Sequence, residues 1–197
     1  ALMCGLRERK KQQTRERIAA AAVALLSEEG DEHATVARIS EQAGVSPRTF
    51  HNYFSRRDDA FFFFFETLVN RWLQEITDAP ADEAPIDLLK RIIFAQVSLA
   101  DDDPYSAKNV MYLLDHTSAS LGRDLNERAQ GLFLQLGNAL YERYGGELDC
   151  IDAHIITILS FLSGGLALKI GDIAPYKEVL HAVFDILDHG INGTPSS

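Results

Sequence analysis

Apolar residues recur at helical spacing along almost the whole chain. After a basic N-terminal stretch, five of them fall at i, i+3, i+4, i+7 and i+8 and form one stripe along a helix: Ile18, Ala21, Ala22, Leu25 and Leu26. Runs of alternating apolar and polar residues are too short for a sheet, and the sequence contains no internal repeat. The pattern therefore predicts an all-α fold.

Local stop and start signals divide the first part of the chain into short helices. Gly30 should end the first helix, and Thr35 should cap a short second one. Ser46 followed by Pro47 is typical of the start of another short helix, which should run to about residue 54. Residues 55–58 have the pattern S-x-x-D, which predicts a capping box opening a long helix to about residue 77.

Five further helices are predicted after a polar linker at residues 78–84. Pro85, Pro104 and Pro175 stand where first helical residues are expected, and Asp149 has the character of an N-cap. The helices should cover 85–100, 104–117, 120–144, 149–171 and 175–190. The whole chain should therefore contain about nine helices.

The spacing of residues 35–57 suggests a function for the N-terminal part. A short helix, a turn at Gly44 and Val45 and a second short helix make a helix-turn-helix layout, in which the second helix enters the DNA major groove. We therefore expect a three-helix DNA-binding domain with a basic arm over residues 1–57. A helical bundle should follow over 58–192, with a flexible tail at 193–197.

The net charge of the whole chain conceals an uneven distribution. Its value of −10, taken alone, argues against a nucleic-acid ligand. Residues 1–57, however, hold 10 Lys/Arg and 7 Asp/Glu, whereas residues 58–197 hold 9 and 22. The N-terminal part is net +3 and the remainder net −13, so the basic end can meet a polyanion that repels the rest.

Residues 35–58 read TVARISEQAGVSPRTFHNYFSRRD and resemble the DNA-binding segment of the TetR family of transcriptional regulators. The family pattern is T-V-x-x-I-A-x-x-A-G-V-S, followed by a short recognition helix ending Y-F-x-x-K. The resemblance extends from near Arg15 to about Phe65. It implies a homodimer that binds a palindromic double-stranded DNA operator. It also implies that domain 58–192 carries the dimer interface and binds a small-molecule effector that releases the repressor. The expected location is the cytoplasm, because the two cysteines make no disulfide framework.

The resemblance also assigns DNA contacts to individual residues. Thr35 and Tyr53 match phosphate-contacting positions, and Arg57 stands where the family often has a lysine that contacts phosphate. The groove-facing positions are Ser46, Arg48, Thr49, His51 and Asn52, and the basic arm carries Lys10, Lys11 and Arg15.

Residues 61–65 are five consecutive phenylalanines, and they follow Ala60, where the family usually has a larger apolar residue. At ~100° per residue, five consecutive positions point all the way round a helix and cannot all face one core. One interpretation packs the first, fourth and fifth rings between the two domains and leaves the second or third partly exposed or under a loop. In another, some of the rings line the effector cavity and transmit its occupancy to the DNA-binding domain.

Helical bundles bind ligands between helices, in cavities lined by apolar groups and a few polar ones. The candidate lining residues are Phe64, Leu68, Trp72, Asn109, Tyr112, His116, Phe133 and Phe161. Their composition favours an apolar or aromatic effector, and the net charge of −13 disfavours a polyanionic one. The alternative for His116 is a structural histidine satisfied within the core.

The last two predicted helices have features of a subunit interface. Apolar residues form a single stripe in 175–190, and small residues in 149–171 allow close helix approach. The expected interface residues are Ser160, Gly164, Ala167, Val179, Leu180, Val183, Phe184 and Leu187. Alternatively, these residues form the internal core of the bundle.

Other kinds of chemistry have little support in the sequence. Cys4 and Cys150 lack metal-binding spacing, and a His/Asp group near the C-terminus reads as a solvated helix face: His181, Asp185, Asp188 and His189. We therefore expect no metal site and no cofactor. Motifs of phosphate-binding loops, serine hydrolases and zinc proteases are absent, so no enzymatic activity is expected.

The longest apolar stretch, at residues 153–168, is shorter than the ~20 residues that a membrane span needs, so no membrane segment is expected. One alternative function remains open. It is a TetR-like regulator that has no small-molecule ligand and acts as an activator or through a protein partner.

Overall fold

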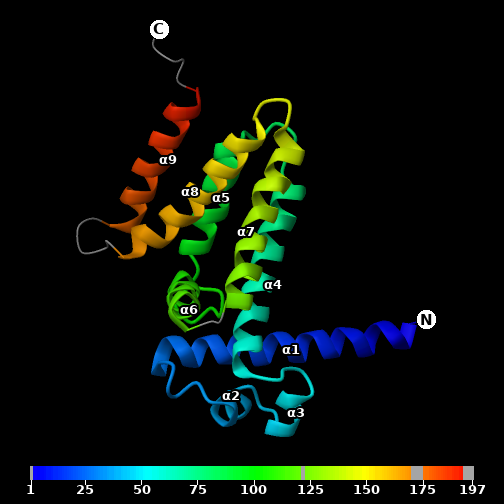
Figure 1. The fold of residues 1–197 in the computed structure, drawn as a ribbon. Helices are drawn as coiled ribbons and strands as arrows, with labels where there is room; N and C mark the ends of the chain where they lie inside the picture. Colours follow the sequence, from blue (N-terminus) through cyan, green and yellow to red (C-terminus); the bar gives the residue numbers. More distant parts are fainter. Residues whose placement is uncertain (1, 121–122, 170–174, 193–197) are drawn as a thin grey trace. The chain divides into compact units, whose positions relative to one another are not determined.

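A computed structural model describes residues 2–120, 123–169 and 175–192 of the chain. Within these ranges every regular element is a helix, so the all-α prediction is confirmed (Figure 1). The helices are α1 (Leu2–Glu29), α2 (Val36–Gln42), α3 (Pro47–His51), α4 (Arg57–Thr77), α5 (Pro85–Val97), α6 (Ala107–Ser120), α7 (Arg123–Tyr144), α8 (Cys150–Lys169) and α9 (Tyr176–Asn192). The tail expected at 193–197 lies outside the described residues.

The chain packs as two compact units, and their division does not fall at residue 57. The first unit comprises Ala1–Leu68 and Ala100–Ala129, and the second comprises Val69–Leu99 and Gln130–Ser197. Helix α6 therefore packs with α1 in the first unit, whereas α5, α8 and α9 pack against one another in the second. The helix-turn-helix thus belongs to a larger body than residues 1–57.

Helix α1 begins well before the apolar stripe that predicted it. Residues 6–17 contain neither glycine nor proline and are mostly Arg, Lys, Gln and Glu, which are good helix formers. Gln12 Nε2 donates a hydrogen bond of 2.9 Å to Glu16 Oε1, one turn away on the helix. The expected basic arm is therefore part of α1. Gly30 ends the helix as predicted, with φ at 86°.

The predicted caps of α2 and α3 are confirmed. Thr35 Oγ1 accepts a hydrogen bond from the Arg38 N–H at 3.3 Å, and Ser46 Oγ accepts one from the Thr49 N–H at 3.0 Å. Between the two helices, Gly44 adopts a φ of 64°, a left-handed conformation that glycine adopts without steric cost.

Helix α4 starts one residue later than the predicted capping box implied. The carboxylate of Asp59, rather than that of Asp58, accepts the Arg56 N–H at 3.0 Å. Asp59 is the third residue of a helix that begins at Arg57, which is the position from which a carboxylate reaches back to the cap. The predicted box is therefore wrong by one residue.

All five phenylalanines at 61–65 are buried, with exposed fractions of 0 to 8%. Phe61 meets the ring of His116 edge-on at a centroid distance of 5.2 Å, and Phe64 stacks on Tyr105 at 4.5 Å. Of the two alternatives expected for the second or third ring, partial exposure is therefore wrong, because both rings are covered.

Arginine side chains explain the burial of those two rings. The guanidinium of Arg128 lies 4.0 Å from the centroid of Phe62, and that of Arg15 lies 4.1 Å from the centroid of Phe63. Both contacts are cation–π interactions that also keep water from the rings. This part of α4 is therefore enclosed around its whole circumference within the first unit.

The predicted start of α6 is also wrong, because Pro104 lies in a turn before the helix. Ser106 takes the capping position: its carbonyl accepts the Val110 N–H at 3.1 Å, and its hydroxyl accepts the Asn109 N–H at 3.4 Å. By contrast, Pro85 opens α5 as predicted. The predicted cap of α8 is confirmed, since Asp149 Oδ1 accepts a backbone N–H at 2.8 Å.

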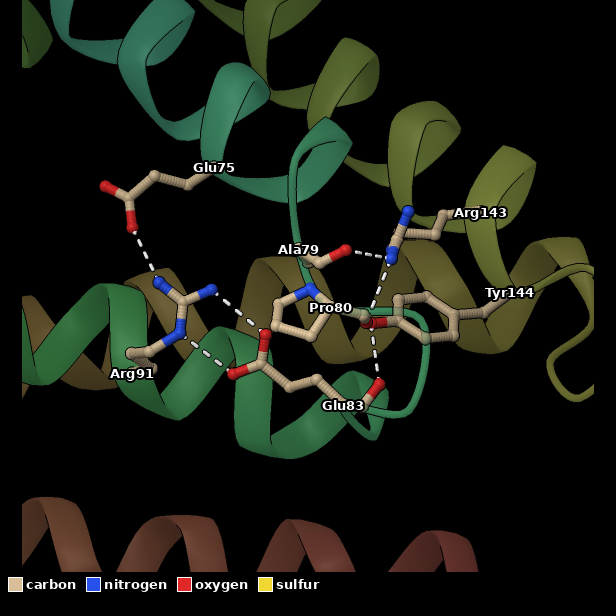
Figure 2. Close-up of polar contacts among 7 residues, drawn as sticks. All are labelled: Glu75, Ala79, Pro80, Glu83, Arg91, Arg143 and Tyr144. Atoms are coloured by element: carbon tan, nitrogen blue, oxygen red, sulfur yellow. Dashed lines mark hydrogen bonds and ion pairs between the residues drawn. The ribbon is translucent and has the colours of Figure 1, made fainter.

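Arg91 of α5 holds two acidic side chains in the second unit (Figure 2). Its Nε and Nη2 donate to the two carboxylate oxygens of Glu83 at 2.8 and 3.0 Å, and its Nη1 lies 3.1 Å from Glu75 Oε2. The hydrogen bonds from Arg91 are the main cause of the lowered pKa of Glu83. This paired geometry is stronger than a single contact between exposed charges.

Arg143 of α7 holds the end of α4 in the same region (Figure 2). Its guanidinium donates to the carbonyls of Thr77 and Pro80 at 3.3 and 2.9 Å, and also to the carbonyl of Ala79. The next residue, Tyr144, donates its hydroxyl proton to the Glu83 carbonyl at 2.9 Å. The bond to Thr77 satisfies a carbonyl that the last turn of α4 leaves without a helical partner, and the other bonds anchor the linker that follows α4.

Replacing Glu83 with glutamine should destabilise the second unit by about 1 kcal/mol at neutral pH, because the paired contact with Arg91 loses its charge. A carboxyl with a lowered pKa stabilises the fold above its ordinary value of 4.5, and this contribution is lost as the pH falls through the folded-state pKa. The wild type and E83Q should therefore converge in acid, as measured by urea unfolding at several pH values. A Glu142→Gln variant, altered at an exposed site on α7, is the control. A difference that stayed constant down to low pH would contradict the assignment.

Candidate nucleic-acid interface and ligand site

Helix α3 presents a row of polar side chains to solvent. Ser46, Arg48, His51 and Asn52 are exposed, while Phe50 on the opposite face is fully buried. Arginine and asparagine side chains can pair in two-point fashion with guanine and adenine edges in the major groove. The exposed row is therefore suited to base contacts, as the sequence predicted.

The phenylalanines behind α3 hold it in place. The ring of Phe50 lies 5.8 Å from that of Phe54, and Phe54 lies 5.7 Å from Phe63 of α4. The helix itself covers only Pro47–His51, so it ends before the predicted end at about residue 54. Asn52 occupies the C-cap position, and Tyr53 follows it half-buried in the next turn.

The remaining candidates for phosphate contact differ in solvent exposure and in the contacts that their side chains already make. Thr35, Lys10 and Lys11 are exposed. Thr49 is half-buried, and its hydroxyl lies 2.9 Å from that of Ser46.

Arg15 packs against the core of the first unit. Its guanidinium lies on the rings of Phe63 and Phe54, with centroid distances of 4.1 and 5.3 Å. Together with Tyr53 and Arg128, it lines a small open pocket of about 230 Å³. Arg15 is therefore partly a packing residue.

Arg57 is bound within its own chain. Its Nη2 lies 2.7 Å from Asp31 Oδ1, and its Nη1 donates to the carbonyls of Asp31 and Ala34 at 2.5 and 3.3 Å. Asp58 lies 3.7 Å from its Nε. This contact has no local signal in the sequence, because Asp31 is 26 residues away from Arg57. A phosphate contact by Arg57 would have to compete with these partners.

Five of the expected ligand residues belong to the first unit, and two of those are already hydrogen-bonded or paired there. Asn109 Oδ1 accepts a hydrogen bond of 2.5 Å from the buried Ser27 hydroxyl, and its amide nitrogen donates to two backbone carbonyls. His116 Nδ1 lies 3.5 Å from Asp31 Oδ1. Tyr112 is 51% exposed, while Phe64 and Leu68 are buried. Asn109 therefore links α6 to α1 through its side chain, so an effector contact by Asn109 would have to compete with these partners.

The other three expected ligand residues come together in the second unit. The ring of Trp72 lies 4.4 Å from that of Phe161, and Phe133 meets Phe161 edge-on at 6.3 Å. These side chains come from α4, α8 and α7, which lie far apart in the sequence. The three rings pack on one another, and clusters of this composition commonly line sites for flat or apolar ligands.

Most of the expected dimer residues are buried inside their own subunit. Ser160, Ala167 and Leu180 are fully buried, and Phe184 is 1% exposed. A Cβ atom at Gly164 would lie 3.1 Å from Ile93 of α5, so the small residues of α8 serve packing within the second unit. The remaining three, Val179, Val183 and Leu187, are half-buried. The expected interface is therefore corrected for the buried residues.

A different face of α8 is apolar and exposed. Its six large side chains follow one stripe along the helix, with exposed fractions of 40 to 69%: Ile151, Ile155, Ile158, Leu159, Leu162 and Leu166. On α9, Ile186 is 71% exposed. A contiguous apolar stripe of this kind marks an interaction surface.

The length and mean hydropathy of α8 also meet the criterion for a membrane span over Cys150–Ala167. That stretch has 18 residues with a mean hydropathy of 1.6, and 39% of it is buried. A core helix with one apolar interface meets the same criterion, and the packing of α8 on α5 and α9 fits that description.

The His/Asp group near the C-terminus does not form a metal cluster. Within the described ranges, no three His, Cys, Asp or Glu side chains lie close enough to hold a metal ion. His189 Nδ1 lies 2.6 Å from the Asp185 carbonyl, and His181 packs on Phe94 with ring centroids 4.7 Å apart.

Comparison with known proteins agrees with this geometry. Residues 18–61 match the family model described as bacterial regulatory proteins of the tetR family. Over 151 residues the chain is 26% identical to the HTH-type transcriptional regulator TcmR of Streptomyces glaucescens. The match covers 74% of this chain and 66% of TcmR, so it spans just under two thirds of that relative.

Solved structures share the fold over nearly the whole chain. The SmeT–triclosan complex aligns with a TM-score of 0.69 at 20% identity, covering 94% of this chain and 98% of SmeT. FadR from Bacillus subtilis in complex with stearoyl-CoA aligns with a TM-score of 0.66 at 18% identity, covering 90% and 98%. The helix-turn-helix therefore matches that of the tetR-family regulators, and the chain shares the fold of these solved structures over nine tenths of its length.

Proposed function

We propose that this regulator is a repressor that binds a palindromic operator as a homodimer and is released by a small apolar or aromatic effector. The observation that carries the proposal is the exposed polar row on α3, which is backed by buried phenylalanines and capped at Ser46. The protein would act in the cytoplasm. Each subunit would place its α3 in a major groove of the operator, and the two α3 helices would lie about 34–36 Å apart.

The contacts divide into base readers and backbone anchors. Arg48, His51 and Asn52 supply groups for base edges, whereas Thr35, Thr49 and Tyr53 supply hydroxyls for phosphates. Lys10 and Lys11 on α1 add positive charge to the same end of the chain.

The exposed stripe of α8, with Ile186 of α9, supports the dimer. Two copies related by a two-fold axis would bury the stripe in a bundle of four helices, which removes its apolar surface from water. The half-buried residues Val179, Val183 and Leu187 lie on α9 beside Ile186 and would join this interface.

The aromatic cluster of Trp72, Phe133 and Phe161 supports the effector. The neighbours SmeT and FadR carry triclosan and stearoyl-CoA, molecules with large apolar parts. Trp72 is the single tryptophan of the chain, so its fluorescence reports binding at the cluster. Compounds that change this fluorescence should also weaken operator binding. If none alters operator binding, the regulator works without a small ligand.

Replacing both Thr49 and Tyr53 with alanine should lower operator affinity by about 100-fold, because each loses a hydroxyl positioned for the DNA backbone. The operator is first selected from random duplex DNA with the wild-type protein, and affinity is then measured by fluorescence anisotropy.

A Tyr141→Ala variant, which alters an exposed tyrosine of α7, is the matched control and should bind normally. Full affinity of the double variant, or selection of no DNA by the wild type, would overturn the DNA assignment.

A further inference from the structure

The loop between α1 and α2 is held by one arginine and one aspartate. Arg57, from the start of α4, donates to the carbonyls of Asp31 and Ala34 and forms an ion pair of 2.7 Å with Asp31 Oδ1. Thr35, which directly follows Ala34, is the N-cap of α2. The guanidinium therefore fixes the backbone from which the helix-turn-helix starts.

The same carboxylate oxygen also faces α6. His116 Nδ1 lies 3.5 Å from Asp31 Oδ1, and the histidine side chain is only 7% exposed. Its ring packs edge-on against Phe61, the first phenylalanine of the buried run. A second tie lies nearby along the same helices, where the buried Ser27 hydroxyl donates to Asn109.

We propose that Asp31 is a positioning residue for DNA binding: it holds Arg57 on the α1–α2 loop and so fixes the angle at which α2 and α3 are presented. Arg57 then acts on the operator through this loop and not as a phosphate ligand. The inference rests on the proposed DNA-binding function.

Two opposite expectations follow for the charge at residue 31. If Arg57 contacted phosphate, Asp31 would compete with the DNA, and removing its charge would strengthen binding. If Asp31 positions the helix-turn-helix, removing its charge weakens binding even though the protein becomes less acidic. The sign of one substitution therefore separates the two roles.

The experiment compares Asp31→Asn, Arg57→Gln, Arg57→Lys and the D31N/R57Q pair on the selected operator, over a range of salt concentrations. Asp31→Asn and Arg57→Gln should each weaken operator binding about tenfold. The D31N/R57Q double variant should bind no more weakly than either single variant, because both substitutions break the same contact. Arg57→Lys should behave like Arg57→Gln, since an ammonium cannot span both carbonyls and the carboxylate. The salt slope should stay at the wild-type value in all four.

A Glu32→Gln variant is the matched control, because it removes the same charge from the neighbouring, exposed position. It should bind as well as the wild type or slightly better. Circular dichroism and thermal unfolding of every variant establish that each is folded at the assay temperature.

Stronger binding by Asp31→Asn, or a salt slope reduced by about one unit in Arg57→Gln with affinity retained in Arg57→Lys, would overturn the proposal in favour of a phosphate contact. Failure of the proposed function looks different, because the wild type itself then binds no DNA sequence. Failure of the Asp31 proposal leaves wild-type binding intact and shows only in the variants.

Discussion

Replacing Leu162 with glutamate should convert the proposed dimer into a monomer and lower affinity for the proposed palindromic operator by about 100-fold or more. Leu162 lies in the exposed stripe of α8 and is 64% exposed in the single subunit. Within one subunit the change should cost no more than about 0.5 kcal/mol, because the side chain already meets solvent. Across a two-fold axis, it places two carboxylates in apolar surroundings without a counter-charge.

Light scattering coupled to size-exclusion chromatography measures the mass, and anisotropy measures operator binding. Leu134→Glu is the matched control, since Leu134 of α7 is 53% exposed but lies outside the stripe. It should remain dimeric and bind DNA normally. A dimeric L162E protein with unchanged affinity would place the subunit interface elsewhere.

Replacing Phe61 with alanine should destabilise the first unit by about 3–5 kcal/mol, because Phe61 is fully buried and its loss leaves a cavity. A change of this size lowers the melting temperature by roughly 6–20 °C for a chain of this length. Thermal and urea unfolding followed by circular dichroism measure the effect.

Phe63→Leu provides the comparison within the same run. It keeps most of the buried volume and mainly removes the ring beneath Arg15, so it should cost about 0.5–1.5 kcal/mol. Equal, small losses for both variants would mean that the run of phenylalanines is not enclosed on all sides.

The helix-turn-helix could be predicted closely because its signals are local. Thr35 and Ser46 cap helices with bonds to residues three positions away, and Gly44 supplies a left-handed turn. Each of these choices depends on a few neighbours in the sequence. The exposed row on α3 followed from the same local periodicity.

Apart from errors of one to three residues at helix starts, what could not be predicted are contacts between residues that are distant in sequence. No residue near Asn109 in the sequence indicates that its side-chain oxygen will accept a hydrogen bond from Ser27. Likewise, no residue near Arg57 indicates its ion pair with Asp31. The small residues of α8 correctly signalled close helix packing, but small residues do not specify the partner helix. Here Gly164 meets α5 inside the subunit.

The phenylalanine run exposes a related limit. Helical periodicity assumes that one face of a helix meets solvent, and residues 61–65 violate it because arginines cover two of the rings. A long charged side chain can seal an apolar surface with its stem and its flat head group. Only the three-dimensional arrangement reveals which cation lies over which ring.

The end of α4 has a consequence for the order of folding. Its start is set by Asp59, which accepts a hydrogen bond from an N–H three residues away, whereas its last carbonyl, that of Thr77, is held by Arg143, 66 residues further along the chain. Closing a loop of that length costs chain entropy before the contact is made, so local structure forms first. The first turn of α4 can therefore form early, while its last turn becomes stable only after α7 has docked, and we expect that turn to fray first when α7 is disturbed.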